Sequence, residues 1–168
     1  MINKEEIKIL SPINQTFLYG YSNYFRYLLK LYKTKKMPNC LLITGPKGVG
    51  KSTLFYHLAN CLLSNNLDRD YLSDINEIDI NNKNYQLITK NIHPDFFLIS
   101  NDIEDSEIKI DQVRNIIKFI NKTSFSNKMK IVFIDNAEFL NKNSSNSLLK
   151  ALEEPPENTH FILCHDSS

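Results

Sequence analysis

Apolar residues along the chain fall into two kinds of pattern: short continuous runs, and longer stretches in which they recur every three or four positions. Four mainly apolar runs, at residues 40–43, 94–99, 130–134 and 160–164, predict buried strands. Three periodic stretches predict amphipathic helices. Their inward-facing residues are Leu54, Phe55, Leu58, Ala59 and Leu62 in the first, Val113, Ile116, Ile117 and Ile120 in the second, and Leu148, Leu149 and Leu152 in the third. This alternation favours an α/β fold with a parallel sheet.

The ends of the predicted helices are marked by capping and breaking residues. Asp111 is a candidate N-cap for the second helix, and either Asn143 or Ser144 starts the third. Pro155 and Pro156 end the third helix, because proline cannot continue a helix.

Two polar segments separate these elements. Residues 64–91 are rich in Asn and Asp and contain neither glycine nor proline, which predicts an inserted, mobile connection with one or two helical turns. Residues 101–107 predict an acidic, solvated surface loop.

The chain contains only four glycines, and three of them fall in residues 45–52. The sequence Gly-Pro-Lys-Gly-Val-Gly-Lys-Ser fits the phosphate-binding loop G-x-x-x-x-G-K-[ST]. A predicted strand precedes this P-loop and a predicted helix follows it, which is the context that the motif requires. The other interpretation, an ordinary glycine-rich turn with an exposed lysine, explains less of this context.

The chemistry of phosphate binding needs these residue types. Glycines let successive backbone N–H groups converge on one phosphate, and the following helix offers further N–H donors to the same anion. Lys51 can reach the β- and γ-phosphates, and the Ser52 hydroxyl suits magnesium, which prefers hard oxygen ligands. We therefore predict ATP and Mg²⁺ as cofactors. The predicted nucleotide-binding residues are Gly45, Pro46, Lys47, Gly48, Val49, Gly50, Lys51, Ser52 and Thr53.

A second motif lies at the end of the third predicted strand. Four apolar residues run into Asp135 at the strand's carboxyl end, where parallel sheets bind ligands. A carboxylate there can hold magnesium beside nucleotide phosphates, although Asp135 could instead simply cap the next turn. The next residue is Asn136, whose amide cannot accept a proton at neutral pH. Glu138 should point elsewhere and serve as a surface or capping carboxylate, so the chain is predicted to bind ATP with little hydrolysis.

Composition and charge exclude few classes of protein. The chain has 168 residues, enough for one domain, and its 20 basic and 19 acidic residues give no argument for or against nucleic acid. Neither a signal peptide nor a membrane-spanning run is recognisable, which predicts a cytoplasmic protein. Cys40, Cys61 and Cys164 are widely spaced, and we expect them to be reduced and mostly buried.

One segment resembles a known family. Residues 146–156, with the sequence Asn-Ser-Leu-Leu-Lys-Ala-Leu-Glu-Glu-Pro-Pro, follow Asp-Asn-Ala-Glu-Phe-Leu at 135–140, and together they closely resemble a hallmark of bacterial clamp-loader AAA+ subunits. His-Pro-Asp at 93–95 and Asp-Gln-Val-Arg at 111–114 extend the resemblance, which is greatest for delta-prime subunits of DNA polymerase III.

The resemblance implies a function. Clamp loaders are five-subunit, ATP-driven machines that open a ring-shaped sliding clamp and place it on primed DNA. A delta-prime subunit is usually a stator that contacts gamma/tau on one side and delta on the other, and reaches the clamp and DNA through the assembled complex. It often does not turn over ATP, in agreement with Asn136. Gamma/tau subunits carry Glu directly after the magnesium Asp and therefore fit less well.

The chain also departs from the family's pattern. Both subunit types commonly carry a four-cysteine zinc module after the P-loop helix, but only Cys61 lies near that region, so we predict no zinc. Family members continue into a fifth strand with a Ser-Arg-Cys motif, a helical lid and a collar domain, whereas this sequence stops at Ser168. We therefore expect residues 1–168 to form an incomplete AAA+ domain, a three-layer P-loop NTPase sandwich without the fifth strand.

The family's strand order, 5-1-4-3-2, would make residues 40–44 the edge of that sheet. The residue that senses the γ-phosphate at the end of the fourth strand corresponds to His165 or Asp166, although a histidine there could equally be a loop residue. Two other functions stay open: an active gamma/tau-like ATPase with Glu138 as its base, and a degenerate fragment without a partner.

Overall fold

A computed structural model describes residues 10–64, 71–72, 77–100, 107–126 and 129–167. Its main sheet has four strands in the order β1-β6-β5-β4, and every neighbouring pair is parallel. The strands are β1 (Cys40–Gly45), β4 (Phe96–Ile99), β5 (Lys130–Ile134) and β6 (Thr159–Asp166). All four predicted strands are therefore confirmed, as is the place of β1 at the edge of this sheet.

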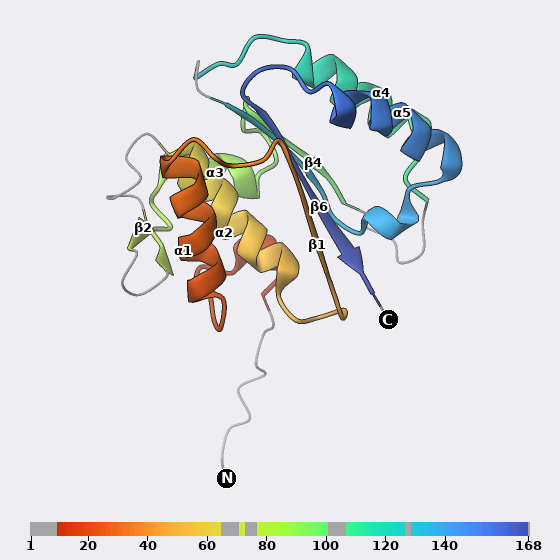
Figure 1. Ribbon diagram of the computed structural model, residues 1–168. Helices are drawn as coiled ribbons and strands as arrows, with labels where there is room; N and C mark the ends of the chain where they lie inside the picture. Colours follow the sequence, from red (N-terminus) through yellow and green to blue (C-terminus); the bar gives the residue numbers. More distant parts are fainter. Residues whose placement is uncertain (1–9, 65–70, 73–76, 101–106, 127–128, 168) are drawn as a thin grey trace.

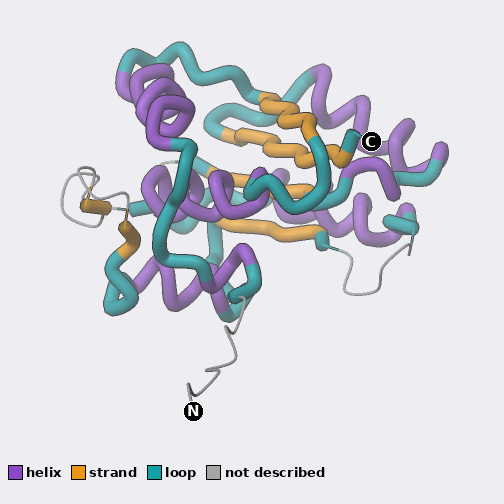
Figure 2. Tube along the Cα trace, turned by 90° about the horizontal axis from the view of Figure 1, so that it is seen from below, coloured by secondary structure: helices purple, strands orange, loops and turns teal. Residues whose placement is uncertain are grey.

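Helices cover both faces of the sheet and make a three-layer molecule (Figure 1). On one face lie α1 (Ser22–Lys33), α2 (Lys51–Leu63) and α3 (Lys83–Thr89), and on the other lie α4 (Ile110–Ile120) and α5 (Lys142–Glu153). Seen from below, the strands run side by side through the middle of the molecule (Figure 2). This arrangement confirms the predicted α/β sandwich with a parallel sheet.

Each face of the sheet has its own apolar core. On the α2 face, the ring centroids of Phe55 and Tyr56 lie 5.4 Å and 5.1 Å from that of Phe133 in β5. On the other face, Ile116 of α4 and Leu148 of α5 are buried. Burying side chains of this size stabilises the fold by about 1.5–3 kcal/mol each, which holds both helical layers on the sheet.

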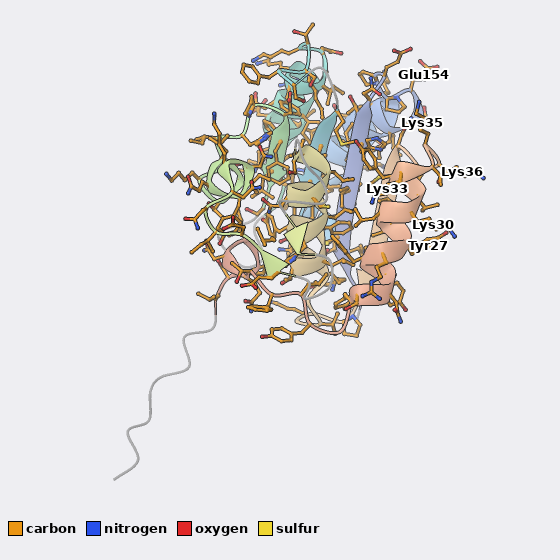
Figure 3. All side chains as sticks on the ribbon, turned by 90° about the vertical axis from the view of Figure 1, so that its left-hand side faces the viewer. Tyr27, Lys30, Lys33, Lys35, Lys36 and Glu154 are labelled. Carbon is orange, nitrogen blue, oxygen red and sulfur yellow. The ribbon has the colours of Figure 1, made fainter. Side chains whose placement is uncertain are left out.

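Helix α2 differs from its prediction, because it is buried nearly all round and has no solvated polar face. Its polar residues His57 and Asn60 are also buried. The reason is its neighbours in the helical layer. Helix α1, which was not predicted, lies on one side of α2 and α3 lies on the other (Figure 3), and the 3₁₀ turn at Pro12–Asn14 also packs against α2.

The polar segment at residues 64–91 contains the helix α3, which confirms the predicted helical turns. It also contains a small antiparallel pair that was not predicted, β2 (Tyr71–Leu72) with β3 (Glu77–Ile78). Short 3₁₀ turns occur at Pro12–Asn14 and Ala137–Phe139. Residues 65–70 and 73–76 of the segment at 64–91, and residues 101–106 of the predicted acidic loop, lie outside the described residues.

Three details of the predicted helices were wrong. Asp111 is not the N-cap of α4 but lies inside its first turn, because the helix begins at Ile110 and its N-cap is Lys109. Helix α5 begins at Lys142, because the side chain of Asn141 accepts a hydrogen bond from the backbone N–H of Ser144 at 2.9 Å and is the N-cap. Leu149 is 50% exposed, because it lies on the side of α5 away from the core.

The His93-Pro94-Asp95 segment has a structural role. Nδ1 of His93 accepts a hydrogen bond from the N–H of Asp95 at 3.1 Å, and the Asp95 carboxylate accepts from the N–H groups of Phe125 and Ser126 at 2.7 Å and 2.9 Å. Burial alone would raise the pKa of Asp95, but the hydrogen bonds from Ser126 and Phe125 outweigh it and lower this pKa. Asp95 thereby fixes the loop that leads into β5.

Candidate nucleotide-binding site

The P-loop connects β1 to α2 at the carboxyl edge of the sheet. Gly48 and Gly50 have φ angles of 83° and 94°, in the left-handed region that glycine tolerates best. Gly50 also precedes the first residue of α2, and no side chain caps this helix. The N–H donors of the first turn are therefore available to an anion.

Lys51 is almost fully buried at the base of this loop. Its ammonium donates hydrogen bonds to the carbonyl oxygens of Gly45 and Pro46, at 2.8 Å and 2.7 Å, and to Oδ1 of Asp166 at 2.5 Å. An ammonium has three N–H donors, so the chain itself satisfies all of them. A phosphate must therefore replace some of these contacts in order to bind Lys51.

The two predicted magnesium residues lie in direct contact. The hydroxyl of Ser52 donates a hydrogen bond to Oδ1 of Asp135 at 2.8 Å, from the first turn of α2 to the end of β5. Burial is the largest effect on Asp135 and raises its pKa. The neighbouring carboxylates of Asp166 and Glu138 raise it further, against hydrogen bonds from Ser52 and Asn136. A hydroxyl and a carboxylate in contact offer the hard oxygen ligands that magnesium prefers.

Glu138 lies closer to this site than the sequence predicted. Its Oε2 accepts a hydrogen bond from the backbone N–H of Asp166 at 3.1 Å, so it does not point elsewhere. The reason is Asn136, whose φ of 59° is left-handed and turns the chain sharply after β5 into the 3₁₀ turn that carries Glu138. This contact is to the last residue of a strand and not to a helix end, so the role of Glu138 as a surface or capping carboxylate stays a prediction.

The two candidate sensor residues point to opposite faces of the sheet, because side chains alternate along a strand. Cys164 belongs to the core on the α2 face, and Asp166, two residues later, contacts Lys51 on that same face. His165 therefore faces the other side, where its Nδ1 is buried and has no hydrogen-bond partner among the described residues. The geometry favours Asp166 as the residue that a bound phosphate would meet.

A small cleft beside the P-loop was missed from the sequence. It has a volume of about 170 Å³ and is lined by residues of the segment before α1 together with the P-loop and Thr53. Its aromatic members are Phe17, Tyr19 and Tyr21, and the hydroxyl of Tyr21 donates to the carbonyl of Val49 at 2.8 Å. A side chain in place of Gly50 would meet the Tyr21 ring at 3.4 Å. The run Phe-Leu-Tyr-Gly-Tyr at 17–21 is the signal that could have indicated this cleft.

The remaining P-loop residues lie on the surface. Pro46, Lys47 and Val49 are exposed, and the carbonyls of Pro46 and Val49 accept hydrogen bonds from Lys51 and Tyr21. The cysteines are all free, as predicted, but Cys40 is exposed because it lies on the outward side of the edge strand β1. Among the described residues, no three His, Cys, Asp or Glu side chains form a metal-binding group. The absence of zinc stays a prediction.

Comparison with known proteins identifies the family of this chain. Residues 20–168 match the protein family described as "DNA polymerase III, delta subunit". The chain belongs to this family. It is 34% identical over 122 residues to the DNA polymerase III subunit delta' of Pseudomonas aeruginosa, a match that covers 73% of this chain and 35% of that protein. The matches span 25–40% of the length of the curated delta-prime relatives.

Two solved structures support the AAA+ fold of this family member. A DNA polymerase III gamma subunit-related protein of Thermotoga maritima has a TM-score of 0.54 at 21% identity, covering 83% of this chain and 39% of that one. The RuvB Holliday junction branch migration motor of the same organism has a TM-score of 0.50 at 16% identity, covering 93% and 42%. Within the described residues, we find no helix with the length and apolar character to cross a membrane.

Proposed function

We propose that the chain binds ATP with Mg²⁺ and is a nucleotide-binding stator of a bacterial clamp loader. The contact between Ser52 and Asp135 is the observation that carries nucleotide binding, because two separate motifs meet there beside Lys51. The P-loop amides and Lys51 would hold the phosphates, and Ser52 and Asp135 would hold Mg²⁺, which neutralises phosphate charge. The aromatic cleft of Phe17, Tyr19 and Tyr21 would receive the nucleoside.

Titration calorimetry with ATP and Mg²⁺ tests this assignment. Lys51→Ala should abolish binding, because the ammonium and its hydrogen bonds are lost, whereas Lys90→Ala, which changes an exposed lysine just after α3, should not. Asp135→Asn should weaken binding in the presence of Mg²⁺ and leave binding in EDTA nearly unchanged. Equal affinity in Lys51→Ala and the parent chain would contradict the assignment.

The assembly role rests on family membership and on the identity with delta-prime relatives. As a stator, the chain would contact delta on one side and gamma/tau on the other in the cytoplasm. The sliding clamp and primed DNA would be reached through the assembled complex. Co-purification with delta and gamma/tau of the same organism tests this role. Failure to retain either subunit, with ATP binding intact, would favour a fragment that has lost its partners.

A second function is favoured by one contact. Because Glu138 reaches the backbone of Asp166, a carboxylate does lie near the place where the terminal phosphate would sit. An active, gamma/tau-like ATPase with Glu138 as general base is therefore the alternative. Steady ATP turnover by the chain would distinguish it from the stator.

A further inference from the structure

The net charge of +1 is the sum of a basic part and an acidic part of the chain. All but two of the 19 acidic residues lie from Asp68 onward, and residues 7–67 contain none. In the described part of that stretch there are seven basic residues. They are Arg26, Lys30, Lys33, Lys35, Lys36, Lys47 and Lys51. Net charge alone therefore gave no indication of a strongly basic surface.

Five of these residues form what we call the α1 basic face: Arg26, Lys30, Lys33, Lys35 and Lys36. They lie on α1 and the turn after it, and all five are exposed. Figure 3 shows the four lysines along one side of the molecule together with Tyr27, and Glu154 at the upper end of the row. In the described part of the chain, no carboxylate lies within ion-pair distance of Arg26, Lys30, Lys35 or Lys36.

The turn that ends α1 keeps a lysine where glycine is favoured. The N–H of Lys35 bonds to the carbonyl of Tyr32 at 2.9 Å, and the N–H of Lys36 bonds to that of Leu31 at 2.8 Å. These two bonds form a Schellman motif, in which Lys35 takes the left-handed position with a φ of 56°. Glycine is the usual residue there, so local stability does not explain Lys35.

Tyrosines accompany the basic residues on the same helix. Tyr24 and Tyr27 are 66% and 58% exposed, and they lie one turn apart. Tyr27 and Lys30 repeat the same spacing. Exposed aromatic rings among cations are typical of surfaces that bind single-stranded nucleic acid, because the cations contact phosphates and the rings stack on unpaired bases. An acidic peptide would need the cations alone.

A cleft lies next to the α1 basic face, at the end of the sheet opposite the P-loop. It has a volume of about 600 Å³, and its polar lining residues are Lys33, Lys35, Asn39, Asn158 and His160. Asn39 precedes β1 and His160 lies near the start of β6, so the cleft is at the amino ends of the strands. The nucleotide site is at their carboxyl ends. A ligand of the cleft would thus be independent of ATP.

We propose that the α1 basic face and this cleft bind single-stranded nucleic acid directly. The lysines and Arg26 contact its phosphates, and Tyr24 and Tyr27 stack on its bases. This goes beyond the proposed function, in which DNA is reached only through the assembled complex. It does not depend on ATP binding at the P-loop.

Fluorescence anisotropy of the whole chain with a labelled oligothymidylate of about 16 nucleotides tests the proposal. Lys30→Gln/Lys36→Gln should weaken binding roughly fivefold for each charge removed at about 0.1 M salt, and lower the slope of log affinity against log salt by about 1.4. The matched control is Lys83→Gln/Lys90→Gln, which removes two exposed lysines in or next to α3 and should change neither quantity.

Two further variants separate binding from folding. Lys35→Gly should weaken DNA binding while keeping or raising the melting temperature, because glycine suits the left-handed position. Tyr27→Ala should weaken binding without changing the salt slope, because it removes stacking and no charge.

Three results would overturn the proposal. Equal losses in the α1 and α3 variants would show general electrostatic attraction. If the α1 variants lose binding to a polyglutamate peptide while their binding to DNA is unchanged, the partner would be an acidic protein segment. Loss of DNA binding in Lys51→Ala would place the phosphates in the P-loop instead.

Discussion

The ammonium of Lys51 lies 2.5 Å from Oδ1 of Asp166, so a carboxylate of the chain itself neutralises the P-loop lysine. The contact joins the first residue of α2 to the last residue of β6, because β1 and β6 are in register with Gly45 beside Asp166. An incoming phosphate brings the same sign of charge to the same ammonium. Asp166 and the nucleotide therefore compete for Lys51.

We expect Asp166→Asn to bind ATP more tightly than the parent chain. The substitution removes the competing charge and the repulsion of the phosphates, while an amide oxygen can still accept a hydrogen bond. Because Asp166 is partly exposed, solvent screens this repulsion. We therefore expect the affinity for ATP to increase roughly fivefold to tenfold, or by about 1–1.4 kcal/mol. Titration calorimetry measures it.

The control for Asp166→Asn is Glu157→Gln, which removes an exposed carboxylate just before β6 and should leave the affinity unchanged. A weaker affinity of Asp166→Asn would mean that Asp166 contributes to the bound state, for example through Mg²⁺, and would contradict competition.

We also expect the chain to release negligible phosphate from ATP. Asn136 occupies the position after Asp135 and its amide cannot accept a proton. Glu138 is near, but its Oε2 already accepts a hydrogen bond from the N–H of Asp166 at 3.1 Å, so this oxygen is engaged by the chain itself and not by an attacking water. A coupled assay of phosphate release, with purified chain and excess ATP, checks this.

The informative variants for turnover are Glu138→Gln and Glu153→Gln, of which the second changes an exposed carboxylate of α5. Should the parent chain hydrolyse ATP steadily and only Glu138→Gln lose this activity, the ATPase alternative would replace the stator.

Local patterns were sufficient to predict the four strands and the two candidate magnesium residues, whereas the strand order followed from the family resemblance. The four strands follow from apolar runs, and Ser52 and Asp135 meet because both lie at the carboxyl edge of a parallel sheet. Contacts set by tertiary packing could not be read in the same way. The burial of His57 depends on the segment before α1, where the carbonyl of Gln15 bonds to its ring, and the approach of Glu138 depends on the left-handed backbone at Asn136.

Contacts between side chains of neighbouring elements also could not be predicted from the sequence. His165 and Asp166 were indistinguishable by position, and only the alternation of β6 on the sheet places Asp166 against Lys51. The exposure of Cys40 follows from its place on the edge strand, and its apolar neighbours in the sequence predicted the opposite.

The free energy of unfolding should decrease as the pH falls from about 6.5 to about 4, because His57 titrates differently in the folded and unfolded chains. Burial lowers the pKa of His57 to about 4, against the raising effect of its hydrogen bond to the carbonyl of Gln15, 3.0 Å away. The unfolded chain therefore binds a proton at a higher pH than the folded chain. Acidification through this window favours unfolding, by up to about 3 kcal/mol.

Urea unfolding at several pH values measures this dependence. His93, whose pKa burial also lowers, contributes to the slope of the parent chain in the same direction. His57→Gln keeps a donor for Gln15 and removes the titration, so the difference between the two slopes isolates His57. Parallel slopes for the two chains would show that His57 does not titrate in this window.

The edge strand β1 should promote self-association of the chain. Its neighbour in the sheet is β6 on one side, and no described strand pairs with its other side. Leu42 is 59% exposed and lies with Cys40 and Thr44 on the outward face, and the strand carries no charge. An uncharged, apolar edge of this kind is a template for pairing with another chain.

Leu42→Lys tests this last expectation, because a charge on the edge should block pairing while the side chain stays in solvent. Light scattering in reducing buffer, which excludes disulfides through Cys40, should show mass increasing with concentration for the parent chain and a monomer for the variant. The control is Leu149→Lys, which changes a leucine of similar exposure on α5. A parent chain that stays monodisperse and melts at high temperature would mean that other residues cover this edge, and equal effects of both variants would place the contact elsewhere.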